Sequence, residues 1–168
     1  MESLLKDISQ YFELLKKSGQ EKFDISSDSK IILDELLLSS EGDEHSDIYI
    51  LDGHATFFSG KSGELLIKIL QAMKLTKESV CICDIDSPES LLSRIQRVKP
   101  EIVITLGAKA TSVILNNNTP LQYLRGRIHE TYGIKVMPTW HPSYLLDNAG
   151  KKRDVWEDMK IVMKHLGL

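Results

Sequence analysis

The sequence predicts a three-layer α/β/α sandwich with a central four-stranded parallel sheet. Short β-branched apolar runs recur along the chain, and helical patterns separate them. The runs are continuous rather than alternating, as in strands that are covered on both faces. Strands that alternate with helices form parallel sheets. The 168 residues, of which 42% are hydrophobic, suit one domain that spans the chain 1–168.

The N-terminal region 1–47 is expected to consist of helix and loop packed on this domain. An opening helix is predicted by apolar residues at spacings of three and four, namely Leu4, Leu5, Ile8, Tyr11, Phe12 and Leu15. The polar stretch 19–30 is rich in turn residues, and the acidic "SSEGDEHSD" at 39–47 reads as a solvated surface loop.

The rest of the chain supplies the strands and the helices of the sandwich. Four strands are predicted at 48–51, 80–83, 102–106 and 134–139. Helical patterns follow at 63–75, 87–100, 108–115 and 151–166. Ser87 is placed as an N-cap with Pro88 at the first helical position, and Gly167 ends the last helix.

Composition limits the classes of function. The net charge is −3, so binding to nucleic acid requires a local basic surface. Cys81 and Cys83 alternate in one strand and have no second pair, so we expect no metal site and no cofactor, and a reducing compartment. No apolar run approaches twenty residues, and residues 1–17 do not resemble a signal peptide. We therefore expect a cytoplasmic protein without membrane association.

Ligands of such folds bind outside the carboxyl ends of the strands. The loops at these ends carry five polar or aromatic candidates: Asp52, His54, Phe58, Asp84 and His141. The "GKSG" at 60–63 lacks the spacing of a phosphate-binding Walker A loop.

Several ordered motifs resemble the uracil-DNA glycosylase superfamily, particularly its family 4. They are "LRGR" at 124–127, "PTWHP" at 138–142, "KRDVWEDM" at 152–159, "PEIVITLGAKAT" at 100–111 and "FSGKSGELLIKIL" at 58–70. The resemblance runs from about residue 48 to the C-terminus. It implies an enzyme that flips a deaminated base out of DNA and hydrolyses its N-glycosidic bond.

The resemblance assigns roles to the motif "PTWHP" and to the residues that follow it. His141 matches the histidine that stabilises charge on the departing base, although a histidine that merely completes a strand end is the structural alternative. Ser143 and Tyr144, with Pro142, would hold the DNA backbone, and Leu145 would fill the vacated stack. Ordinary packing is the alternative for Leu145 or for its neighbour Leu146.

Two base-contacting positions follow from the same resemblance. Phe58 matches the aromatic residue that stacks on the base, with Phe57 as an interchangeable neighbour. Asp84 stands where the family has an asparagine that reads the uracil edge. Because a carboxylate offers only acceptors, and donates only when protonated, this departure changes the expected base preference.

The first catalytic motif also departs from the family. The loop "LDGHATFFSG" is shorter than its counterpart, and Asp52 occupies about the place of a glutamate that orients the attacking water. Asp52 either keeps that role or caps its own turn, and His54 is a second candidate. The family's cluster cysteines are absent from the sequence, so no iron–sulfur cluster is expected.

Basic residues suggest a DNA-binding rim. Lys151, Lys152 and Arg153 begin the last helix, where phosphate would offset the unfavourable macrodipole. Arg125, Arg127 and Lys109 could extend the rim, the alternative being solvated side chains.

Three hypotheses follow. The protein is an active glycosylase of base excision repair, a degenerate relative that binds DNA or a free base without cleavage, or an interaction module that keeps the scaffold.

Overall fold

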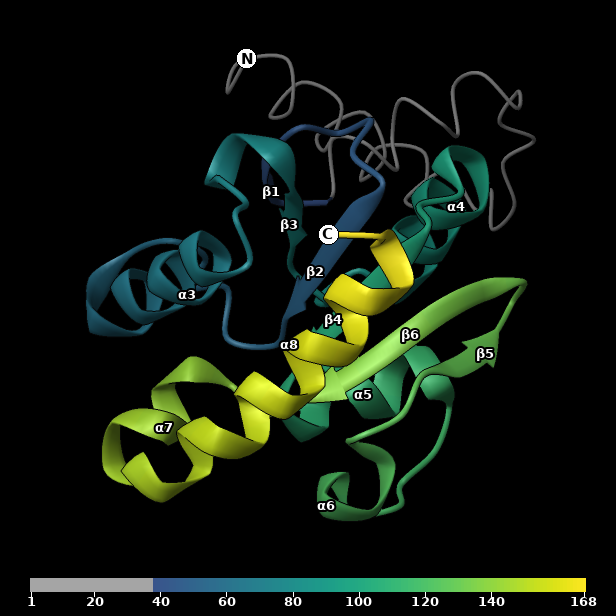
Figure 1. The fold of residues 1–168 in the computed structure, drawn as a ribbon. Coiled ribbons are helices and arrows are strands. Elements are labelled where there is room, and N and C mark those ends of the chain that lie inside the picture. The colour runs from purple at the N-terminus through teal and green to yellow at the C-terminus, as the bar shows by residue number, and fades with distance from the viewer. Residues whose placement is uncertain (1–37) are drawn as a thin grey trace, which may run out of the picture. The chain divides into compact units, whose positions relative to one another are not determined.

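The computed structural model describes residues 38–168, all of which belong to one compact unit, Leu33–Leu168. Their centre is a six-stranded sheet in the order β1-β3-β2-β4-β6-β5 (Figure 1). The predicted opening helix lies outside the described residues, so it stays a prediction. In the described part of the chain, no helix combines the length and the apolar character needed to cross a membrane.

The four predicted strands form the parallel centre of the sheet. They are β2 (Ile48–Asp52), β3 (Cys81–Cys83), β4 (Ile102–Leu106) and β6 (Ile134–Thr139), paired in the order β3-β2-β4-β6. The sheet is wider than predicted because an antiparallel strand covers each edge. β1 (Ser40–Gly42) pairs with β3, and β5 (His129–Thr131) pairs with β6. The acidic segment 39–47, expected to be a loop, thus contributes a short strand.

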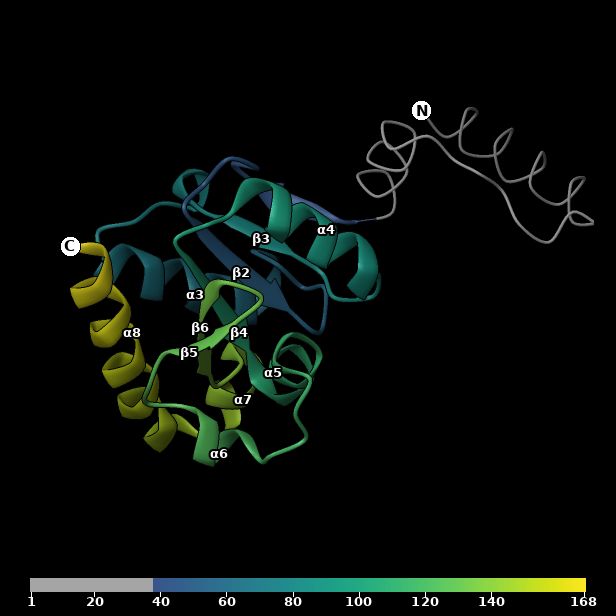
Figure 2. The same ribbon diagram turned by 90° about the vertical axis from the view of Figure 1, so that its right-hand side faces the viewer.

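Side chains alternate between the two faces of the central strands, and each face buries its own apolar cluster. One cluster joins Ile48, Ile50, Ile104 and Met137 to three helices, α3 (Gly60–Ala72), α7 (Pro142–Asp147) and α8 (Lys152–Leu166). The other joins Tyr49, Leu51, Val103 and Val136 to α4 (Pro88–Val98) and α5 (Gly107–Leu115). Figure 2 shows these two helix layers on opposite sides of the sheet. The three-layer α/β class is therefore confirmed.

Two features of the helices refine the predictions. α4 has Pro88 at its start, and α8 ends at Gly167, which has a left-handed φ of 71°. The segment between the predicted strand 134–139 and the predicted helix 151–166 contains α7, and a 3-10 turn at Ala149–Lys151 follows it. A further short helix, α6 (Leu121–Leu124), precedes β5.

The strand register brings the carboxyl ends of three strands together. Asp52 of β2 lies opposite Leu106 of β4, and Leu106 lies opposite Thr139 of β6. The loops after Asp52 and after Thr139 therefore leave the same edge of the sheet, as expected for a ligand site of a parallel α/β fold.

Candidate active site

The carboxylate of Asp52 organises the loop after β2. This residue is 1% exposed. Its Oδ1 accepts a hydrogen bond from the backbone N–H of His54 at 2.8 Å. Its Oδ2 accepts from the backbone N–H groups of Thr56 and Phe57, at 2.9 and 2.8 Å, and from the Thr56 hydroxyl at 3.0 Å. Asp52 thus caps its own turn, as one of the two alternatives predicted.

The ring of His141 reaches the same carboxylate from the end of β6. Its Nδ1 accepts the backbone N–H of Ser143 at 3.0 Å, and its Nε2 lies 3.0 Å from Oδ1 of Asp52. Because Nδ1 is an acceptor, the neutral ring carries its hydrogen on Nε2 and donates it to Asp52. The residue is 4% exposed. The site therefore contains a neutral imidazole with one N–H donor.

The hydrogen bonds to Asp52 also set its charge state. Burial acts to raise the pKa of this carboxyl, but the hydrogen bond from His141 and the backbone N–H groups of His54 and Phe57 outweigh it. The pKa of Asp52 is held well below its ordinary value. The group is a stable anion and a poor proton acceptor.

His54 covers the imidazole of His141. The two rings are stacked with centroids 4.4 Å apart and an interplanar angle of 18°, and His54 is exposed. The ligand atoms of Asp52, His54 and His141 lie within 4.8 Å of one another, a spacing that a metal ion could bridge. Nε2 of His141 is a donor, however, and nearly parallel rings do not aim their lone pairs at one point. The arrangement fits a hydrogen-bonded pair better than a metal centre.

Phe58 follows this turn and lies two residues before the start of α3 at Gly60. It is half-buried and, like Phe57, packs against the apolar cluster beneath α3. A Cβ at Gly63 would lie 2.0 Å from the carbonyl carbon of Phe58. Because Gly63 has no side chain, α3 can approach the backbone of Phe58 closely. Stacking of Phe58 on a base stays a prediction.

Asp84 is buried at the end of β3 and is held by its own neighbourhood. Its two oxygens accept the backbone N–H groups of Ser39 and Asp86, at 3.2 and 3.3 Å. Lys109 ties the neighbouring loops together, because its Nζ donates to the carbonyl of Gly53 at 3.2 Å and pairs with Asp86 at 3.3 Å. Each oxygen of Asp84 thus already accepts a hydrogen bond from the chain, and a role in base recognition stays a prediction.

Four cavities within the described residues do not border the predicted catalytic or base-contacting residues. They are lined by side chains other than Asp52, His54, Phe58, Asp84 and His141. The exposed ring of His54 covers one face of the His141 imidazole.

The expected DNA-binding rim is partly exposed. Lys151, Lys152 and Arg153 are exposed, and Lys151 pairs with Asp154 at 3.2 Å. Tyr144 is exposed and stacks on Trp140 with ring centroids 5.0 Å apart. The hydroxyl of Ser143 lies 2.6 Å from Nδ1 of His141, so this side chain also helps to orient the imidazole.

The two leucines of α7 have opposite environments. Leu145 is 1% exposed and belongs to the apolar core, whereas Leu146 is 45% exposed. A wedge must project from the surface, so Leu146 has the geometry for that role and Leu145 has the geometry of a packing residue.

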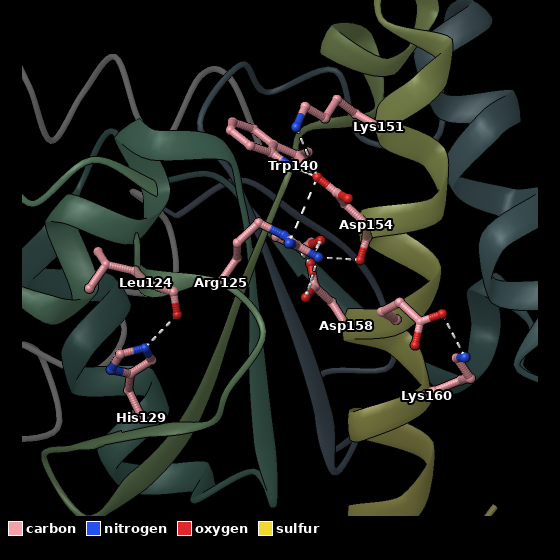
Figure 3. A network of polar contacts seen from close by, with 10 residues as sticks. Leu124, Arg125, His129, Trp140, Lys151, Asp154, Asp158 and Lys160 are labelled. Atoms are coloured by element: carbon pink, nitrogen blue, oxygen red, sulfur yellow. Dashed lines mark hydrogen bonds and ion pairs between the residues drawn. The ribbon is translucent and has the colours of Figure 1, made fainter. Parts of the chain in front are cut away.

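Arg125 and Arg127 differ in the same way. Arg127 is exposed. Arg125 points into the protein and forms an ion pair with the buried Asp158 at 2.9 Å (Figure 3). Arg125 is therefore engaged by the protein itself, while Arg127 is open to a phosphate.

Asp158 and Thr139 were not among the predicted site residues. Thr139 donates its hydroxyl hydrogen to Oδ2 of Asp158 at 2.7 Å. The pattern held a signal, because Asp158 falls between Val155, Met159 and Val162 on the apolar face of α8. An acid on a buried helical face requires a partner.

Comparison with known proteins identifies the family of this chain. The family model of the uracil DNA glycosylase superfamily matches residues 40–160. The chain is 32% identical to a type-4 uracil-DNA glycosylase of Thermotoga maritima, over 61% of this chain and 65% of the relative. It is 27% identical to a type-4 uracil-DNA glycosylase of Saccharolobus solfataricus, over 65% of this chain and 62% of that relative. The chain thus spans somewhat less than two thirds of the length of each. Because the family model covers most of the sequence, the chain belongs to the uracil-DNA glycosylase superfamily.

Proposed function

We propose that the protein binds DNA and hydrolyses the N-glycosidic bond of a deaminated base that has been flipped from the helix. The observation that carries this proposal is the neutral imidazole of His141, which holds an N–H donor at the carboxyl edge of the sheet beside an anionic Asp52. The two relatives that are type-4 uracil-DNA glycosylases supply the substrate class.

The chemistry needs a donor where negative charge develops. When the bond between the base and the sugar breaks, the electron pair leaves with the base, and the sugar becomes an oxocarbenium-like cation. The Nε2–H of His141 would turn from Asp52 to an oxygen of the departing base, an oxyanion-hole type of contribution. A neutral ring does this without transferring its proton.

Asp52 then acts through its charge. Since its pKa is held well below its ordinary value, it is a weak general base. An anion at this position would stabilise the cationic sugar and orient the water that adds to its anomeric carbon. The hydrogen lost by the water passes to solvent.

Entry of the base requires a rearrangement of one residue. His54 is exposed and lies over His141, so its ring would move aside and leave its position to the base. Phe58 would stack on the base, and the exposed Leu146, Lys151, Lys152, Arg153, Arg127 and Tyr144 would contact the DNA around it.

A single-turnover assay tests the proposal. Oligonucleotides that contain uracil, hypoxanthine, xanthine or cytosine are incubated with excess protein, and cleaved abasic sites are counted. We expect release of at least one deaminated base, with a rate constant that falls about a hundredfold or more in His141→Ala. Absence of release from every substrate would contradict the proposal.

A second candidate is a protein that binds DNA or a free base without cleavage. Two observations favour it: both oxygens of Asp52 already accept hydrogen bonds, from loop residues and from His141, and His54 covers the imidazole. Binding of these oligonucleotides without cleavage, weakened in a Lys152→Ala and Arg153→Ala double variant, would support this candidate. If the protein neither binds nor cleaves these oligonucleotides, the remaining hypothesis is the interaction module.

A further inference from the structure

Two carboxylates on one face of α8 hold the end of β6. Asp158 accepts the hydroxyl hydrogen of Thr139 at 2.7 Å. Asp154, one helical turn earlier, accepts the indole N–H of Trp140 at 3.2 Å. Figure 3 shows Asp154 and Asp158 pointing from α8 toward Arg125 and Trp140. Two acids four residues apart on the helix thus bind Thr139, the last residue of β6, and Trp140, which follows it.

Arg125 completes the network. Its Nε and Nη2 donate to the two oxygens of Asp158 at 3.1 and 2.9 Å, so the pair is bidentate. The guanidinium also donates to the backbone carbonyl of Asp154. The "LRGR" segment is thereby tied to α8 and, through Asp158, to the strand.

Stability alone is a weak reason for this arrangement. Asp158 is 0% exposed, and burial raises the pKa of its carboxyl against the opposing effects of Thr139 and Arg125. Buried ion pairs can often be replaced by apolar residues without loss of stability. A network that fixes two consecutive residues with directional bonds gives geometric precision instead.

The residue that follows these two is His141. The ring of His141 is held by Ser143 and Asp52. A Cβ added at Gly107 would lie 3.2 Å from the Cβ of His141, so the start of α5 packs closely against this residue. Asp154 and Asp158 of α8 therefore add a further restraint on His141, because they bind the two residues that precede it.

We propose that Asp158, oriented by Arg125, is a positioning residue that fixes the end of β6 through Thr139 and so sets the place of the His141 imidazole. The inference rests on the proposed function where it concerns rate, and it stands on geometry where it concerns the ring. A displacement of about 1 Å in a reacting group can reduce a rate on the order of a hundredfold.

The matched pair Thr139→Val and Thr139→Ser separates this role from simple packing. Valine keeps the shape of threonine but removes the donor to Asp158, and serine keeps the donor. Under saturating protein, we expect Thr139→Val to lower the single-turnover rate constant about tenfold or more without a change in DNA affinity. Thr139→Ser should keep most of the rate. Equal rate constants for the two variants, measured below the unfolding transition of both, would overturn the proposal.

A second readout does not depend on cleavage. In the ¹⁵N-labelled free protein, the ring signals of His141 are assigned from their loss in His141→Gln. We expect the wild type and Thr139→Ser to show one tautomer with hydrogen on Nε2 and slow exchange of that hydrogen with solvent. Thr139→Val should show faster exchange or a mixture of tautomers. If no oligonucleotide is cleaved, the proposed function fails, yet unchanged ring signals in Thr139→Val would separately refute the positioning role.

Discussion

The two loops that meet at the candidate active site are held in different ways. The loop after β2 depends on one carboxylate, Asp52, whose oxygens accept the backbone N–H groups of three loop residues. The end of β6 depends on two acids of a neighbouring helix, Asp154 and Asp158, and on Arg125. The first loop carries its own anchor, whereas the second is anchored from elsewhere in the fold. Loss of one side chain should therefore disturb the first loop more than the second.

The largest effect is expected for Asp52→Ala. The change leaves three partly buried backbone donors and the buried His141 N–H without their acceptor, so we expect the free energy of unfolding to fall by about 3–5 kcal/mol. Urea denaturation measures it. Asp86→Ala is the matched control, because Asp86 is an exposed acid of a neighbouring loop and should change stability little. Similar losses in the two variants would contradict the central place of Asp52.

The two leucines of α7 should separate stability from DNA contact. Leu145→Ala removes a core side chain and should cost about 2–4 kcal/mol of unfolding free energy. Leu146→Ala should cost less than about 0.5 kcal/mol but should weaken binding to DNA with a flipped base. Thermal unfolding measures the change in unfolding free energy, and a fluorescence binding assay measures the change in DNA affinity. The reverse pattern would show that Leu145, not Leu146, is the wedge.

Gly63→Ala tests the close approach of α3 to the first loop. The added Cβ meets the backbone of Phe58, which cannot move as a flexible side chain can, so we expect a loss of about 1–3 kcal/mol. Gly150→Ala places its Cβ in open space and serves as the control. Comparable unfolding midpoints for the two variants would indicate that the helix and the loop are less tightly packed than described.

The smallest effect concerns pH. The pKa of Asp52 is lower in the folded protein than in the unfolded chain, so its contribution is present above a pH of about 4 and is lost as the pH falls toward the folded pKa. One such group changes stability by at most about 1.4 kcal/mol per pH unit. Asp52→Asn should flatten the acid limb of a plot of unfolding free energy against pH. An unchanged slope would mean that another carboxyl dominates acid unfolding.

Much of the fold was predictable because its strands are buried on both faces. Continuous apolar runs such as 102–106 cannot be surface strands, and the alternation of strands and helices implies parallel pairing. The edge strands were missed because they are not buried on both faces. Ser40–Gly42 and His129–Thr131 are partly exposed three-residue strands, so neither has an apolar pattern to detect. The family resemblance read from the motifs is confirmed by the match over residues 40–160.

The candidate site was predictable at the level of loops. Asp52 and His141 are 89 positions apart in the chain, yet both follow parallel strands and were expected at one edge of the sheet, where they form a hydrogen bond. The network of Arg125, Asp158 and Thr139 was not predictable, because it depends on how α8 packs across the sheet. Arg125 carries a charge like that of Arg127, and sequence alone does not distinguish the buried cation from the exposed one.

The central claim is that His141 is a neutral donor that leaves Asp52 for a flipped base. The most direct measurement is the ¹⁵N NMR signal of its Nε2–H during titration with an oligonucleotide that carries an uncleavable 2′-fluoro analogue of deoxyuridine. We predict that the signal shifts on binding while the hydrogen stays on Nε2, and that Asp52→Asn alters the free but not the bound position. An Nε2–H signal that stays fixed while the backbone amides of Lys151, Lys152 and Arg153 shift would show that DNA binds without the base reaching His141.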